Sequence, residues 1–64
     1  MTYDWQLIDT SSNGRNLYKD ATSHFHCITE PWETPQDASA FLFGVTPETR
    51  EWFDRRWEFL ANEE

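Results

Sequence analysis

Hydrophobic and polar residues recur with a helical period over residues 46–62, at the end of the chain. At about 100° per residue, one face of this segment collects Thr49, Phe53, Arg56, Trp57 and Leu60. The opposite face collects Glu51, Asp54, Arg55 and Glu58. Trp52 and Phe59 lie together at one flank of the apolar face and widen it. The pattern predicts an amphipathic helix that covers the rest of the fold.

Two Thr-Pro pairs mark helix starts in the second half of the chain. Thr46 is a suitable N-cap and Pro47 a suitable first helical residue, because proline has no backbone N–H to leave unpaired. Since residues 34–35 repeat this pair, we expect a shorter helix from Pro35 to Phe43. Gly44 is then expected to end that helix in a left-handed conformation.

Three short segments in the first half alternate apolar and polar side chains, as β-strands do. They are Trp5–Thr10, Arg15–Lys19 and His24–Thr29. The links between them are short, and strands joined by short links usually pair as neighbours. We therefore expect a three-stranded antiparallel meander.

Asn13-Gly14 is a strong hairpin signal between the first two strands. A two-residue loop would scatter the apolar residues over both faces of the sheet. A three-residue loop over residues 12–14, with Gly14 left-handed, instead pairs Ile8 with Tyr18. That register gathers on one face Trp5, Leu7, Leu17 and Ala21. It is the register that we predict.

These elements predict an α+β fold in the order β-β-β-α-α, a three-stranded antiparallel meander covered by a short helix and a longer C-terminal amphipathic helix. Residues 1–64 make a single small acidic domain. Cys27 is the only cysteine, so no disulfide forms within the chain. One thiol and no signal-peptide pattern predict a cytoplasmic protein. No segment reaches the apolar length of a membrane span.

The chain is acidic, with twelve Asp and Glu against five Lys and Arg and a net charge of −7. Residues 1–29 contribute −1 (three acids, two bases) and residues 30–64 contribute −6 (nine acids, three bases). The acidity therefore belongs to the helical half. It disfavours direct binding to nucleic acid or to an anionic membrane, since phosphates need a basic surface. It favours a basic partner met by electrostatic steering, and it also keeps a small protein soluble.

His24, His26 and Cys27 form the one cluster of residue types that bind metals. On a strand the two histidines share a face and Cys27 points to the other, whereas zinc needs three or four converging ligands. Adjacent strand positions also keep His26 from serving Cys27 as a general base. We therefore expect no enzyme activity, no cofactor and no bound metal.

Eleven aromatic residues, four of them tryptophan, exceed what so small a core hides easily. Trp52 and Phe59 lie off the buried stripe of the C-terminal helix, so we expect them to contact a partner. The predicted partner-binding surface comprises Trp52, Phe59, Glu48, Glu51, Asp54, Arg55 and Glu58.

We interpret the protein as a non-enzymatic interaction module, most concretely a small acidic inhibitor or regulator of a basic-surfaced, nucleic-acid-handling protein. Phage and mobile-element inhibitors that imitate nucleic acid have this size and charge, which is a likeness of composition and not of motif. One alternative is an accessory subunit or homodimer joined through Trp52 and Phe59. The other is a metal-binding domain that uses His24 and His26.

Overall fold

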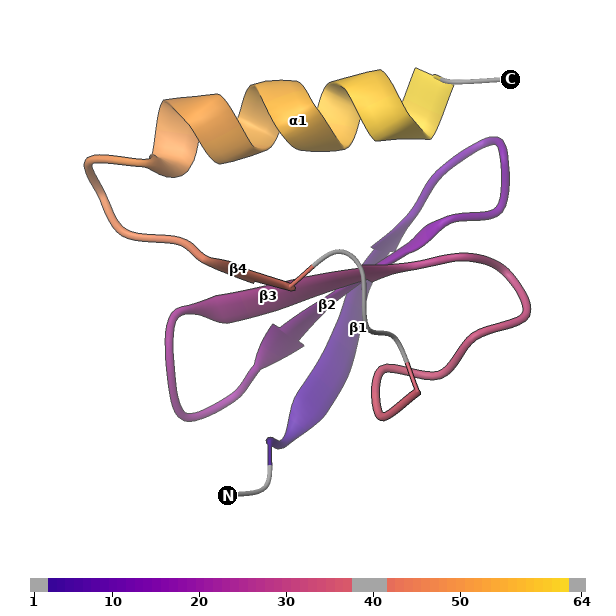
Figure 1. The fold of residues 1–64 in the computed structure, drawn as a ribbon, viewed down its shortest axis with the longest axis horizontal. Helices are drawn as coiled ribbons and strands as arrows, with labels where there is room; N and C mark the ends of the chain where they lie inside the picture. Colours follow the sequence, from indigo (N-terminus) through magenta and orange to yellow (C-terminus); the bar gives the residue numbers. More distant parts are fainter. Residues whose placement is uncertain (1–2, 38–41, 63–64) are drawn as a thin grey trace.

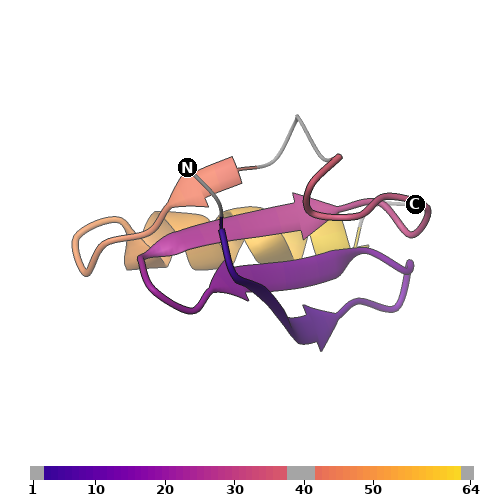
Figure 2. The same ribbon diagram turned by 90° about the horizontal axis from the view of Figure 1, so that it is seen from below.

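The computed structural model describes residues 3–37 and 42–62, which form a two-layer α+β structure (Figure 1). The sheet is antiparallel, in the order β1-β2-β3-β4, with strands Trp5–Thr10 (β1), Asn16–Asp20 (β2), Phe25–Thr29 (β3) and Leu42–Gly44 (β4). Helix α1, Arg50–Asn62, lies across one face of this sheet (Figures 1 and 2). The predicted α+β class, the antiparallel meander and the C-terminal helix are confirmed.

The predicted three-residue loop joins β1 to β2. The Ser11 N–H donates to the Arg15 carbonyl oxygen at 2.8 Å, which closes the loop over residues 12–14. Gly14 has a φ of 90°, in the left-handed region where a Cβ is unfavourable. Pro31, just after β3, packs closely against this glycine.

The predicted pairing of Ile8 with Tyr18 is wrong, because β1 contains a bulge. Asp9 still pairs with Leu17, as the predicted register requires, but Leu7 pairs with Tyr18 and leaves Ile8 as the extra residue. A bulge bends an edge strand and re-aims its side chains. The one apolar face predicted from Trp5, Leu7, Leu17 and Ala21 is therefore divided, with Leu17 facing α1 and Leu7 on the other side of the sheet.

The segment from Pro35 to Phe43 differs from the short helix that was predicted for it. Thr34–Asp37 form a single turn, in which the Asp37 N–H donates to the Thr34 carbonyl oxygen at 3.0 Å. Residues 38–41 lie outside the described residues, and Leu42–Gly44 form the edge strand β4. Pairing with the open edge of β3 outweighs the local signal of the Thr-Pro pair, as tertiary context commonly does.

Gly44 lacks the predicted left-handed conformation, since Gly14 is the only glycine with positive φ among the described residues. Gly44 pairs instead with Phe25 across β3 and β4. A Cβ on Gly44 would lie 3.2 Å from Cε1 of the Phe25 ring, so the glycine leaves room for this ring to lie against the strand.

The core lies between the sheet and α1. Its buried members are Leu17, Ile28, Val45, Phe53 and Leu60, and Trp57 packs against them. Leu17 and Ile28 are paired across β2 and β3, while Phe53 and Leu60 come from the predicted apolar face of α1. This predicted face is confirmed for its apolar members.

The other face of the sheet carries a second set of apolar side chains near its start. The Tyr3 ring lies 4.9 Å from the Trp5 ring and 5.6 Å from the Phe25 ring, between centroids. Cys27 points to this side and is buried, as predicted. Strand β3 therefore carries apolar side chains on both faces, with Ile28 toward α1 and Phe25 and Cys27 on the other side.

Candidate functional site

A hydrogen-bonded turn positions the start of α1. The Thr49 N–H donates to the Thr46 carbonyl oxygen at 3.1 Å, and the Thr46 N–H donates to Thr49 Oγ1 at 2.8 Å. The regular helix then begins at Arg50, later than predicted, with Thr46 capping the turn that leads into it. The Glu48 carboxylate accepts from its own backbone N–H and from Thr46, and these bonds lower its pKa. Glu48 thus belongs to the cap and lies just before the helix.

One flank of α1 exposes two large aromatic side chains. Trp52 is 58% exposed and Phe59 is 60% exposed, whereas Phe53 and Leu60 of the same helix are buried. The Arg56 guanidinium carbon lies 5.8 Å from the centre of the Phe59 ring, within cation–π range. Arg56 follows Trp52 by four residues and precedes Phe59 by three, so the three side chains form one row. We call this row, Trp52, Arg56 and Phe59, the aromatic flank.

Arg56 corrects the predicted faces, because it is exposed and does not join the apolar side. Sequence reasoning left it out of the predicted surface, although its spacing from Trp52 and Phe59 was the available signal. Arginine between two aromatic residues is typical of the side chains that dominate binding energy at protein interfaces.

The outer side of α1 carries charge of both signs. Arg50 pairs with Asp54, Nε to Oδ1 at 3.2 Å, and Arg55 pairs with Glu51, each pair one helical turn apart and exposed. Glu58 adds a third acid and Arg56 a third base, so the charges of residues 50–62 balance. Exposed pairs of this kind contribute only about 0.3–0.5 kcal/mol each to stability. Their effect here is to neutralise the acidic face that the sequence predicted.

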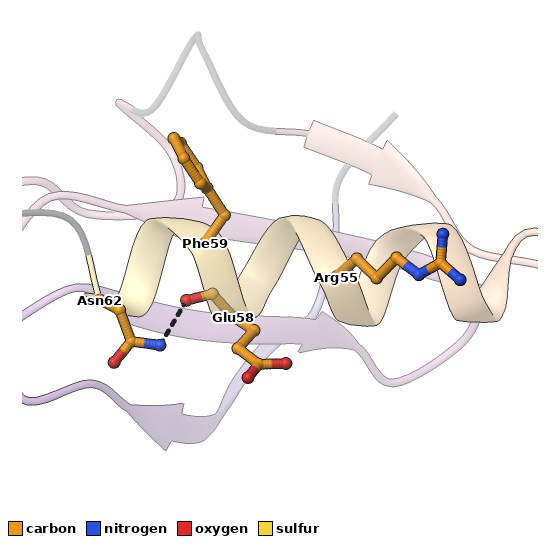
Figure 3. Close-up of a pocket in the computed structure, with 4 residues that line it drawn as sticks. All are labelled: Arg55, Glu58, Phe59 and Asn62. Atoms are coloured by element: carbon orange, nitrogen blue, oxygen red, sulfur yellow. Dashed lines mark hydrogen bonds between the residues drawn. The ribbon is translucent and has the colours of Figure 1, made fainter.

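A shallow hollow lies beside Phe59 (Figure 3), with a volume of about 390 Å³. Its described walls are Arg55, Glu58, Phe59 and Asn62. Asn62 Nδ2 donates to the Glu58 carbonyl oxygen at 2.8 Å, which closes the last turn of the helix. In the view of Figure 3, Phe59 points to the upper edge of the helix and Glu58 to the lower edge, so the hollow has an apolar wall on one side and an acidic wall on the other.

Of the predicted surface, six residues lie on α1 and Glu48 lies in the turn before it. The structure brings Trp52 and Phe59 to one flank, as predicted. It places Glu51, Asp54, Arg55 and Glu58 on the outer side, also as predicted.

His24, His26 and Cys27 take the predicted sides of the sheet. Among residues 3–37 and 42–62 no group of three or more His, Cys, Asp or Glu side chains is arranged to hold a metal ion. Burial raises the pKa of the Cys27 thiol, and the charge of Glu33 adds to that effect. The thiol is therefore in its less nucleophilic, protonated form at neutral pH.

No helix in the described part of the chain is both long and apolar enough to cross a bilayer. Comparison with protein families, with curated proteins and with solved structures gave no match to this chain.

Proposed function

We propose that the protein is a non-enzymatic interaction module that docks on a basic-surfaced protein through the aromatic flank of α1. The observation that carries this proposal is the exposure of Trp52 and Phe59 on a helix whose Phe53 and Leu60 are buried. Covering two such rings on binding releases their hydration water and is favourable. Aromatic residues and arginine are also the side chains that most often dominate interface energies.

The net charge of −7 supports a basic partner, because opposite charge speeds encounter and orients the two surfaces. Since Glu51 and Asp54 are each paired with an arginine, the outer side of α1 alone offers little unbalanced negative charge. The attraction comes from the whole chain, and the close contact comes from the aromatic flank. On this basis we propose a small acidic inhibitor or regulator of a nucleic-acid-handling protein, of the phage or mobile-element type.

We also propose a cytoplasmic setting. A chain with one cysteine forms no internal disulfide, and Cys27 is buried as a free thiol. Both features fit a reducing compartment.

The test is affinity capture from a lysate by the immobilised protein at about 50 mM and about 300 mM salt, which screens exposed charges to different extents. The parent is compared with the double variant Trp52→Ala/Phe59→Ala and with Trp32→Ala. Trp32 is a matched control, because it is a strongly exposed tryptophan that lies outside α1.

The proposal requires that one basic protein is retained by the parent and by Trp32→Ala, is lost from the double variant, and is retained less at high salt. The proposal is contradicted if the double variant still captures this protein, or if the amount captured is the same at both salt concentrations.

A second candidate function is homodimerisation through the same flank. The alternation of arginine with acidic residues on α1 is self-complementary, so two copies of this helix would not repel each other. Sedimentation at increasing concentration distinguishes the two. A dimer that withstands high salt and dissociates in Trp52→Ala favours the second candidate.

A further inference from the structure

A larger hollow lies between the sheet and the start of α1. It has a volume of about 480 Å³, and its described walls come from β1, β2, β3, the turn that leads into the helix and the first residue of α1. Ile8, the extra residue of the bulge, forms part of the wall together with Val45. The basic side chains of the wall are Lys19, His24, His26 and Arg50. We call these four residues the basic groove.

The charge of this groove opposes that of the chain. It gathers two of the five Lys and Arg residues and both histidines. None of the described residues that line it is acidic, although the chain has twelve acids. A concentration of positive charge in an acidic protein costs stability through mutual repulsion unless a counter-charge is present.

His26 gives the groove a fixed polar group. Its side chain is only 9% exposed, and its ring packs 5.0 Å from the Phe53 ring, between centroids. Nδ1 lies 2.9 Å from the His24 carbonyl oxygen, and the Val45 N–H donates to the same oxygen at 3.1 Å. Because a carbonyl only accepts, Nδ1 carries the proton of this bond. Nε2 makes no hydrogen bond to any residue in the described part of the chain.

Lys19 and Arg50 keep donors for a ligand. Lys19 Nζ donates to the carbonyl oxygens of Asp20 at 3.0 Å and Ser23 at 3.1 Å, both neutral acceptors that leave its charge uncompensated. Arg50 uses Nε for Asp54, and its two terminal nitrogens bond to no described residue. The guanidinium thus retains the paired donors that recognise planar or tetrahedral oxyanions.

We propose that the basic groove binds an oxyanion, a phosphate or a carboxylate group, held between Lys19, His26 and Arg50. Arg50 supplies a fork of donors, Lys19 a point charge, and protonated His26 an Nε2–H. The apolar side chains of Ile8 and Val45 reduce the access of water and so strengthen these charge-assisted bonds. The site is separate from the aromatic flank and does not depend on it.

Binding couples to the protonation of His26. Burial lowers the pKa of His26, and the charges of Lys19, Arg50 and His24 lower it further, while the bond to the His24 carbonyl acts in the opposite direction. A bound oxyanion offsets the positive charge around His26 and stabilises its imidazolium. The two carboxylates on the neighbouring elements are already engaged, Asp54 with Arg50 and Glu48 within its cap. We therefore expect binding to strengthen as the pH falls through the titration of His26.

The experiment follows the imidazole C–H signals of both histidines by NMR during titration with inorganic phosphate, with sodium acetate and with sodium chloride at equal ionic strength. Phosphate or acetate should shift the His26 signals saturably and raise the pKa of His26, whereas chloride should do neither. Tighter binding of phosphate than of acetate identifies a phosphate ligand, and the reverse order identifies a carboxylate. Equal responses to all three salts overturn the proposal.

Arg50→Gln and Arg55→Gln make a matched pair, because both arginines are exposed on α1 and each pairs with an acid one turn away. Arg50→Gln should weaken binding about tenfold, the loss expected for one charge-assisted hydrogen bond. Arg55→Gln lies outside the groove and should leave binding unchanged. Lys19→Gln should also weaken binding, which tests the site from a second element. Equal effects of the two arginine substitutions contradict the assignment.

Discussion

Arg15 joins the loop between β1 and β2 to the last turn of α1, since Arg15 Nη1 donates to the Leu60 carbonyl oxygen at 2.8 Å. Asn13 Nδ2 donates to the same oxygen at 2.8 Å, and Arg15 Nε pairs with Glu30 at 2.8 Å. The last turn of α1 contains no basic residue of its own. The hairpin therefore supplies the donors and the positive charge that the end of a helix favours.

Replacing Arg15 with alanine should lower stability by about 2 kcal/mol, because it removes the charge-assisted hydrogen bonds to Glu30 and to the Leu60 carbonyl from a partly buried position. In a domain of this size that corresponds to a fall in Tm of roughly 10 °C. Thermal unfolding followed by circular dichroism measures the change. Arg55→Ala is the control, because its exposed pair with Glu51 should be worth less than about 0.5 kcal/mol. Equal losses in the two variants would contradict the capping role of Arg15.

Local signals in the sequence predicted the parts of this fold that local chemistry decides. Asn13-Gly14 indicated the hairpin, the distribution of apolar residues selected its three-residue loop, and the helical period separated Phe53 and Leu60 from Trp52. The bulge at Ile8 was not predicted, because a single extra residue leaves no mark in an alternating pattern. The position of the bulge depends instead on contacts between β1 and the rest of the fold.

Those contacts involve residues far apart in the chain. With Asp9 opposite Leu17 on the α1 side, the Trp57 indole N–H reaches Asp9 Oδ2 at 3.3 Å. Strand β4 was not predicted because it forms by pairing with the edge of β3, a segment distant in the sequence. The two candidate sites differ in the same way, one depending on local sequence and the other on contacts between distant segments. Helical periodicity predicted the exposure of Trp52 and Phe59 but not that of Arg56, whereas the basic groove is assembled from several elements and leaves no local pattern.

Gly14→Val should destabilise the protein by more than about 1 kcal/mol, because a β-branched residue resists a positive φ. A Cβ at this position would also lie 2.8 Å from Cγ of Pro31. Chemical denaturation gives the free energy of unfolding. Gly44→Ala should cost less, since Gly44 has no positive φ and only the Phe25 ring must give way. A Gly14→Val protein as stable as the parent would be inconsistent with the left-handed loop.

Two apolar substitutions on α1 should differ sharply in cost. Phe53→Ala should lower the free energy of unfolding by about 3–5 kcal/mol, enough to unfold so small a domain. Trp52→Ala should change it by less than about 1 kcal/mol, because most of that side chain is exposed. Circular dichroism reports the fold of each variant. The assignment of faces fails if Trp52→Ala unfolds the protein while Phe53→Ala does not.

Cys27 should react slowly with a thiol reagent in the native protein. Its side chain is 2% exposed, and burial together with the charge of Glu33 raises its pKa, so little thiolate is present or accessible. Absorbance of the released reagent at neutral pH measures the rate, and denaturant should increase it to that of a free thiol. Labelling of the native protein at the unfolded rate would mean that β3 is not buried as described.

The buried carboxylate of Asp20 should make stability depend on pH. Asp20 Oδ2 accepts from Ser23 Oγ at 2.5 Å and from Thr22 Oγ1 at 3.1 Å, and Oδ1 accepts from the Asp4 backbone N–H at 2.7 Å. The bond from Ser23 is the largest cause of a pKa below the ordinary value of 3.8, followed by the Asp4 bond, and burial opposes both.

Because the folded pKa of Asp20 is lowered, its contribution is complete above the unfolded pKa and is lost as the pH falls toward the folded value. We therefore expect the Tm to hold near neutral pH and to fall below about pH 4. Asp20→Asn should have a lower Tm than the parent at pH 7, since an amide cannot accept all three hydrogen bonds, and the difference should shrink as the pH falls. Thermal unfolding of both proteins across this range tests the prediction. A Tm difference that stays constant down to about pH 2 would show that the charge of Asp20 does not hold the β2–β3 turn.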